Sequence, residues 1–222
     1  KYGPSNYSIY MNKDYGNVKG YTFSFTKRYD PVSKTSAFVD YTYQVTEGNS
    51  VNSGSFYYNA LSGEQEEKRI VPLAWDQRHI LNTNLSIGDP RNWNVGIISK
   101  LSSGWPYTPN IPDANYVPQP NSGRKPWQWR IDMRVHKNFK VGNLNYLFFM
   151  KIYNLLDRRN ERYVFNDTGR AGYTYVYQST QETQGFKNHY GESGVHEWSE
   201  YQIRPHYYTS PRSINIGFSV DF

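Results

Sequence analysis

The chain has 222 residues and a net charge of +6, and its aromatic fraction of 18% stands beside a hydrophobic fraction of only 37%. Its basic residues are spread along the sequence and form no long Lys/Arg run, which argues against a nucleic-acid partner. The absence of cysteine excludes disulfide frameworks and zinc-thiolate sites. No stretch of about 18 apolar residues occurs, so no transmembrane helix is predicted.

The dominant pattern is an alternation of apolar and polar residues in eight segments separated by turn residues. The first segment carries Tyr7, Ile9 and Met11 and ends at a turn predicted over residues 14–17. The apolar sides of the other seven are Tyr21, Phe23 and Phe25; Ala37, Val39, Tyr41, Tyr43 and Val45; Leu81, Thr83, Leu85 and Ile87; Trp93, Val95, Ile97 and Leu101; Trp127, Trp129, Ile131, Met133 and Val135; Leu144, Tyr146, Phe148, Met150 and Ile152; and Ile214, Ile216, Phe218, Val220 and Phe222. No segment has a helical period, so we predict an all-β, antiparallel chain.

The connections between these segments favour a transmembrane β-barrel over a soluble β-sandwich, which remains the alternative. From the third segment onward they alternate in length, with short turns at Asp89-Pro90 and Gly142-Asn143 and long connections over residues 47–76, 102–126 and 154–211. Membrane barrels have short periplasmic turns, long outer loops and aromatic girdles, and aromatic residues here lie near strand ends. Because every backbone polar group must be paired in lipid, such a sheet must close.

Several motifs occur in order along the chain. They are a strand hairpin over residues 15–28, in which Thr22 or Ser24 replaces the usual acidic residue; the strand of residues 37–47; Trp75-Asp76-Gln77-Arg78-His79; Gly104-Trp105-Pro106-Tyr107-Thr108-Pro109; Asn154-Leu155-Leu156-Asp157 followed by Asn160; and the terminal Phe222. Together they resemble the C-terminal part of TonB-dependent outer-membrane receptors, especially the receptor-like proteins of Bacteroidota.

This resemblance implies a barrel of roughly 22 strands, of which residues 1–222 supply about eight C-terminal ones, in the bacterial outer membrane. It further implies energy-coupled nutrient uptake, with an N-terminal plug domain that contacts TonB and lies outside these residues. Outer-membrane lipid, the barrel-assembly machinery and a surface lipoprotein are the other expected partners. A passive porin-like or adhesin-like barrel without energy coupling is the alternative.

Three groups of residues are candidate sites. The terminal strand, with Ile214, Ile216, Phe218, Val220 and Phe222, is the expected assembly signal. Arg130, Asp132, Arg134 and His136 form a charged row expected to face the lumen, either as a plug or substrate contact or as a scaffold ion-paired across neighbouring strands. Lys100, Lys151 and Asp40 are expected to behave similarly. Aromatic residues of the last connection are candidate ligand contacts or loop packing: Tyr173, Tyr175, Tyr177, Trp198, Tyr207 and Tyr208.

An outer-membrane enzyme is the third possibility, and the sequence argues against it. His196, Glu200 and His206 lie in a region without a helical pattern and match no helical zinc motif. No Gly-x-Ser-x-Gly nucleophile elbow occurs. We therefore expect no catalytic residues, no metal and no cofactor.

Overall fold

The computed structural model describes residues 14–49, 69–110, 118–175 and 203–221, and in these residues the chain is all-β. Seven long strands dominate: β1 (Gly16–Asp30), β2 (Thr35–Gly48), β4 (His79–Asp89), β5 (Trp93–Ser102), β8 (Gln128–Val141), β9 (Leu144–Tyr153) and β10 (Ser213–Asp221). Short strands β3 (Val71–Pro72), β6 (Pro106–Tyr107) and β7 (Gly123–Arg124) and a 3-10 turn at Pro205–Tyr207 lie in the connections.

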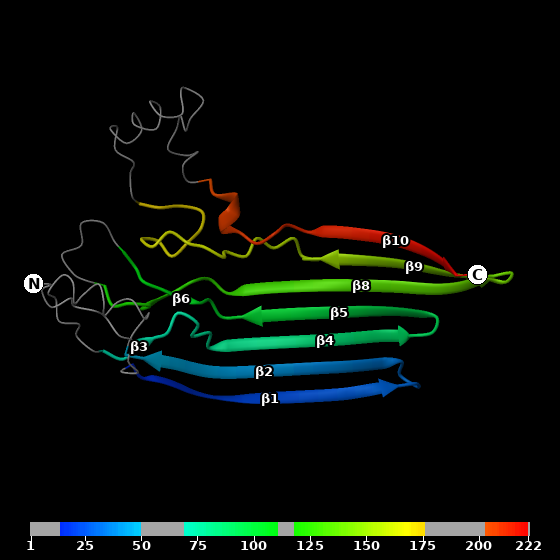
Figure 1. Cartoon of the computed structure of the whole chain (residues 1–222), viewed down its shortest axis with the longest axis horizontal. Helices are drawn as coiled ribbons and strands as arrows, with labels where there is room; N and C mark the ends of the chain where they lie inside the picture. The colour runs from blue at the N-terminus through cyan, green and yellow to red at the C-terminus, as the bar shows by residue number, and fades with distance from the viewer. Residues whose placement is uncertain (1–13, 50–68, 111–117, 176–202, 222) are drawn as a thin grey trace, which may run out of the picture.

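The long strands form one antiparallel sheet in which each strand pairs with its neighbour in the sequence. The order is β1-β2-β4-β5-β8-β9-β10, with β3 added beside β2, while β6 and β7 form a separate hairpin. The strands run side by side across the molecule (Figure 1). The described sheet is open, with β1 and β10 as its edges, so an all-β antiparallel sheet is confirmed but no closed barrel is present.

The strand predictions hold for seven of the eight alternating segments, and the first, around Tyr7, lies outside the described residues. The turn predicted over residues 14–17 is wrong in its second half. Gly16 and Asn17 already belong to β1 and pair with Gly48 and Glu47 of β2, because the hairpin ladder extends further than the alternation indicates. The two-residue strands are too short to carry an alternating pattern, and the sequence did not predict them.

The two ends of the sheet differ in the connections they carry. Tight turns at residues 31–34, 90–92 and 142–143 gather at one end, which we call the turn end. The described parts of the long connections, with β3, β6 and the 3-10 turn, lie at the opposite, loop end (Figure 1). Local chemistry forms the turns: Gly142 adopts a positive φ of 61°. The Asp30 carboxylate accepts the Val32 and Ser33 N–H groups at 3.0 and 3.1 Å.

The strand register places the alternating apolar residues of the seven described long strands on one face of the sheet. One row of partners runs through Ala37, Leu85, Ile97, Met133, Ile152 and Ile214, from β2 to β10. Successive side chains on a strand point to opposite faces, so the residues between them form a polar face. A register slip of one residue in any pair would mix the two faces. The sheet therefore has one continuous apolar face.

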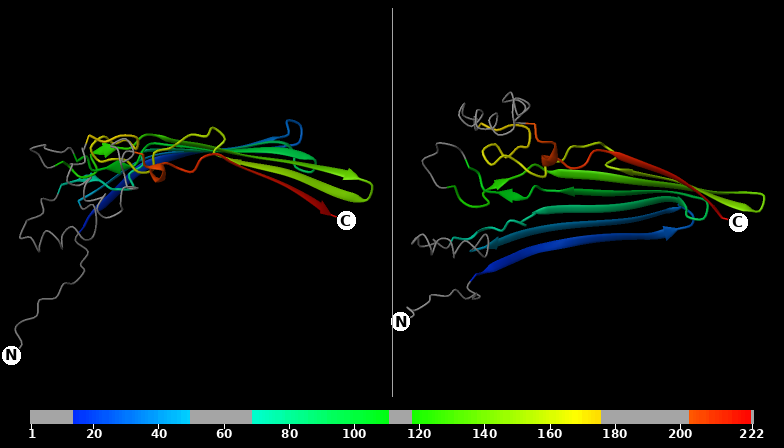
Figure 2. Two further views of the ribbon diagram at one scale, coloured as in Figure 1. Left: turned by 90° about the horizontal axis from the view of Figure 1, so that it is seen from above. Right: turned by 45° about the horizontal axis from the view of Figure 1, so that its top comes forward.

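No packed core lies beneath this apolar face in the described part of the chain. Phe23 and Ile216 expose 67% and 66% of their surface. Ile152 is the one buried hydrophobic residue of the long strands, and the others, Val71, Val164, Phe165 and Ala171, lie at the loop end. Seen from above, the strands form a single bent layer (Figure 2). Both faces of the sheet are thus free of a second layer of described residues.

Neighbouring strands are staggered in a constant direction. A row of partners that meets β2 at Thr35, its first residue, meets β4 at Ile87, two residues before its end, and β8 at Val135, six before its end. From the first hairpin to the third, the row moves away from the turns by roughly 1.5 residues, or about 5 Å, for each strand step of ~4.8 Å. The strands therefore run at about 45° to the line through their turns.

Aromatic rings on the apolar face concentrate toward its two ends. Near the loop end, Tyr21 contacts Tyr43, Tyr43 contacts His79, and His79 stacks on Trp127, with ring centroids 5.3, 5.1 and 5.5 Å apart. Near the turn end, the Tyr146 ring lies 5.3 Å from Phe139 and 5.5 Å from Phe218. Mostly aliphatic residues lie between these groups, including Leu81, Leu85, Ile97, Met133, Val135 and Met150.

Candidate functional site

The charged row predicted from the sequence lies on the polar face of β8. Arg130, Asp132, Arg134 and His136 alternate with the apolar residues that continue the opposite face. Lys151 of β9 and Lys100 of β5 join them on the polar face, since Lys151 is the register partner of Arg134 and Lys100 that of Arg130. We call Lys100, Arg130, Arg134 and Lys151 the cationic strip.

The ion pairing in this row runs along one strand and not across strands, contrary to the scaffold interpretation. Arg130 Nε donates to Asp132 Oδ1 at 2.8 Å, and the Asn154 N–H donates to the same oxygen at 2.8 Å. Arg134, Lys100 and Lys151 form no ion pair with any described carboxylate. The cross-strand neighbours are like charges, and such pairs are repulsive.

A shallow depression of about 340 Å³ lies beside Arg134 and Lys151. The Phe149 ring forms part of its lining, and the Lys151 ammonium lies 5.3 Å from the centre of that ring. On β10, a Cβ at Gly217 would lie only 2.1 Å from Phe149, so the ring rests directly against the glycine backbone. On β5, Gly96 pairs with Arg134 and carries no side chain at that position.

At the loop end, Asp76 joins its own connection to strand β2 and to the following connection through its fully buried carboxylate. Its oxygens accept the Thr46 N–H at 2.8 Å and the guanidinium of Arg124, and Arg78 lies 3.4 Å away. Beside it, Gln77 Nε2 donates to the Ser103 carbonyl at 2.9 Å. A buried carboxylate is stable only when paired and hydrogen-bonded, and this one is. Asp76 and Gln77 of the Trp75–His79 motif therefore have a structural role.

The hairpin of β6 and β7 packs through Tyr107. A Cβ at Gly123 or Gly169 would lie 2.5 or 2.3 Å from this side chain, so the ring lies between two glycine backbones. Burial raises the pKa of the Tyr107 phenol, and the charge of Asp167 raises it further. Burial also lowers the pKa of the nearby Lys125 ammonium. The glycines of this region thus allow close packing of the connections.

The Asn154–Asn160 motif fastens the last connection to the sheet. Asn160 binds the backbone of Trp129 twice, accepting its N–H and donating to its carbonyl, both at 2.9 Å. Asn154 Nδ2 donates to the Arg158 and Ser210 carbonyls, and Asp157 accepts the Arg212 N–H. These side chains satisfy backbone groups where β8, β9 and β10 meet the connections.

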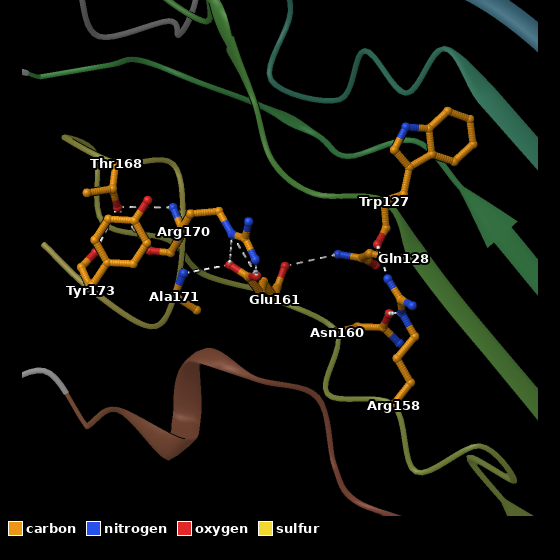
Figure 3. Close-up of polar contacts among 9 residues, drawn as sticks. All are labelled: Trp127, Gln128, Arg158, Asn160, Glu161, Thr168, Arg170, Ala171 and Tyr173. Atoms are coloured by element: carbon orange, nitrogen blue, oxygen red, sulfur yellow. Dashed lines mark hydrogen bonds and ion pairs between the residues drawn. The ribbon is translucent and has the colours of Figure 1, made fainter.

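Glu161 organises the next turn of the same connection. Its carboxylate accepts the Ala171 N–H at 2.6 Å and pairs with Arg170 at 2.8 Å (Figure 3). The hydrogen bond with Glu161, together with its charge, raises the pKa of the Arg170 guanidinium. Gln128, the first residue of β8, donates to the Glu161 carbonyl at 3.4 Å. This part of the connection is thus bound to the sheet through polar contacts.

The predicted loop aromatics fall into two groups, and Tyr177 and Trp198 lie outside the described residues. Tyr173 and Tyr175 pair edge to face with centroids 5.8 Å apart, and neither lies in a strand. Tyr207 packs on Phe165 at 5.2 Å, and its backbone carbonyl accepts the Arg162 N–H. Tyr208 pairs with Glu161 in an isolated bridge. Tyr207 is thus part of the packing between connections.

Sequence reasoning missed Phe165 and Arg204 at the loop end. The Arg204 guanidinium stacks on Phe165 at 5.0 Å and on Tyr207 at 5.3 Å. A shallow depression of about 620 Å³ lies beside them, lined in part by Arg159, Arg204 and Tyr208. Arg and Tyr residues that are spaced irregularly in a connection give no periodic signal. Only the high number of Arg and aromatic residues in this connection could have indicated such a cluster.

The candidate assembly strand is β10, which pairs with β9 and leaves its other edge open in the described sheet. Ile214, Ile216, Phe218 and Val220 lie on the apolar face, opposite Ile152, Met150, Phe148 and Tyr146. Phe222 lies outside the described residues. Because Asp221 pairs with Asn145, next to the Gly142-Asn143 turn, the strand ends at the turn end.

Within the described ranges, no group of three or more His, Asp or Glu residues could hold a metal ion. Nor does the described part of the chain contain a helix long and apolar enough to cross a membrane. Comparison with known proteins finds no family model, curated protein or solved structure that matches the chain.

Proposed function

We propose that this chain forms part of the wall of an outer-membrane β-barrel receptor that takes up a nutrient. The observation that carries the proposal is the continuous apolar face, which crosses all the long strands and has no described layer against it. A soluble sandwich would bury such a face against a second sheet. A membrane barrel turns it toward lipid and its polar face toward the lumen.

The stagger and dimensions of the sheet support the same proposal. Strands in membrane barrels tilt by roughly 35–45°, and the register shift here corresponds to about 45°. Between Trp129 and Phe139, which mark the two aromatic ends on β8, ten residues extend about 33 Å. At that tilt the depth is about 23 Å, close to the roughly 25 Å apolar band of membrane barrels.

The described apolar face carries three lysines, Lys19, Lys27 and Lys137, and the side chains of the last two extend toward the turns. Lys137 Nζ donates to Asn92 Oδ1 at 2.6 Å, and Lys27 Nζ donates to Ser33 Oγ at 3.0 Å. Asn92 and Ser33 both lie in turns at the end of the sheet. Long cationic side chains at a membrane boundary extend toward water in the same way. The aliphatic middle of the face keeps no ammonium group.

Membrane insertion is tested with the full-length protein that contains this chain, expressed in a Gram-negative host. We expect it in the outer-membrane fraction, where a folded barrel migrates differently on a denaturing gel before and after boiling. A protein found in the soluble periplasmic or cytoplasmic fraction would reject the proposal. A folded membrane barrel would be consistent with both the receptor hypothesis and the passive-barrel hypothesis.

Energy coupling is proposed because the sequence motifs resemble those of TonB-dependent receptors. A separate experiment tests it. Cells with and without the full-length protein are compared for depletion of nutrients from the medium, with and without a protonophore that collapses the inner-membrane gradient. Depletion that requires both the protein and the gradient supports the receptor. Depletion that persists without the gradient favours the passive barrel, which is the second candidate.

We also propose that the terminal strand is the assembly signal of this barrel. The exposed β10 edge supports this role because an extended strand can be recognised by β-augmentation. Deletion of Phe222 should lower outer-membrane insertion, measured as the fraction of heat-modifiable protein. Substitution of the turn residue Val32, which exposes 92% of its surface, by Ser is the control. Unchanged insertion after the deletion would count against the signal.

A further inference from the structure

The cationic strip has too little negative charge around it to be explained as a scaffold. Its four cations lie on three neighbouring strands, and Asp132 is the one carboxylate among them in the described residues. Asp132 already binds Arg130 and the Asn154 N–H, both on its loop-end side. Asp40, two strands from Lys100 in the same row, accepts a hydrogen bond from Ser24 at 2.7 Å.

The arrangement of these cations on neighbouring strands is electrostatically unfavourable. Arg134 directly opposes Lys151, and Lys100 directly opposes Arg130, although like charges in these positions destabilise a sheet. An anion placed between Arg134 and Lys151 would reverse that repulsion, and an arginine fork suits carboxylate and phosphate geometry. A carboxylate or phosphate bound between the two side chains would therefore complement their positive charge.

The depression beside these two cations also offers an apolar surface. The Phe149 ring lies against the Gly217 backbone, and any side chain larger than glycine would displace it. Leu147 lines the same depression, together with Asn138. Across the strand pair, Gly96 adds no side chain opposite Arg134. A flat apolar group next to a negative charge would match this surface.

We propose that the polar face binds a small organic anion whose carboxylate or phosphate lies between Arg134 and Lys151 and whose apolar part rests on Phe149. The inference deepens the proposed uptake function, and rests on it for the claim that a solute reaches this face. It names the substrate class as an anion that carries a flat apolar group. Binding itself requires neither a membrane gradient nor an energised cell.

The test uses the full-length protein, purified in detergent and folded, and titrates it calorimetrically with benzoate, inorganic phosphate and benzyl alcohol. Benzoate should bind most tightly, because it alone has both the charge and the ring. Arg134→Gln and Lys151→Gln should each raise the benzoate Kd by about 10-fold or more, as expected for loss of a charge-assisted hydrogen bond. Phe149→Leu should weaken benzoate but leave phosphate unchanged.

Lys140→Gln is the matched control, because it removes the same charge from the polar face of β8 near its turn, away from the lining of this depression. Equal weakening by this control would overturn the site, since the effect would then be general electrostatics. Benzoate binding that Arg134→Gln and Lys151→Gln leave intact would also overturn it. Unchanged benzoate binding to a protein whose uptake ignores the gradient would reject the energy coupling and keep the site.

Discussion

The orientation of the two faces can be tested by placing one charge on each side of the same strand. Leu85 lies in the aliphatic part of the apolar face, between Ala37 and Ile97. Its neighbour Asn84 lies on the polar face, between Phe38 and Ile98. Both side chains are exposed in the isolated sheet, Leu85 by 36%. Leu85→Arg and Asn84→Arg are therefore matched in strand, depth and exposure.

The expected cost differs because the two faces meet different surroundings. An arginine facing lipid near the middle of a membrane costs about 2–4 kcal/mol, so Leu85→Arg should lower the free energy of unfolding by that amount. Asn84→Arg should change it by less than about 0.5 kcal/mol, as for an exposed surface substitution.

The measurement is urea unfolding of each full-length variant in lipid vesicles, followed by tryptophan fluorescence, with the heat-modifiable fraction in cells as a second readout. Equal effects of the two substitutions would refute the assignment of the apolar face to lipid. A larger effect of Asn84→Arg would reverse the assignment of the faces.

Three further substitutions test the loop end, each in the folded full-length protein. Asp76→Asn should lower the free energy of unfolding by about 3 kcal/mol, because it leaves the partly buried Arg124 without its carboxylate. A melting temperature equal to that of the parent protein would contradict this role of Asp76. Asn160→Asp places an acceptor against the Trp129 carbonyl in place of a donor, and should lower the free energy of unfolding by about 1–3 kcal/mol. It should also speed protease cleavage of the last connection. The control Asn143→Asp, in an exposed turn, should leave the cleavage rate unchanged. The Tyr107 phenol has a raised pKa in the folded protein, so its contribution to stability is present below pH ~10 and is lost as the pH rises through the folded pKa; Tyr107→Phe should reduce the fall in melting temperature between pH 9 and 11, and an equal fall in both proteins would contradict this.

The sheet was largely predictable, because its information is local and periodic. The alternation in residues 127–135 marks both the strand and the face of each side chain, and the register of β8 with β5 keeps that assignment. The first and last residues of a strand were harder to predict where no turn residue marks the end of the pairing. β1 begins at Gly16 although Gly and Asn usually signal a turn, since its partners on β2 continue the ladder to Gly48.

The loop end was predictable only through its motifs. The sequence marks Asp76 and Asn160 as unusual residues, yet their partners, Arg124 and Trp129, lie 48 and 31 residues away. No periodicity connects such pairs, because they depend on how the connections meet in space. The cationic strip shows the same limit, since the alternation placed Arg134 on the polar face but the register alone sets Lys151 opposite it.

The unbroken register has a consequence for how this sequence can change in length. One residue inserted within a long strand would turn every later side chain of that strand to the wrong face, unless a bulge absorbed it. The irregular pairing between Lys27 and Asp30, beside the first turn, is a place where such a change has little effect. Away from β3 and the hydrogen bonds of Asp76 and Asn160, the connections at the loop end carry no such constraint, because they lie outside the ladder. Insertions and deletions in relatives of this chain should therefore collect at the loop end, and tags or labels placed there should leave the sheet intact.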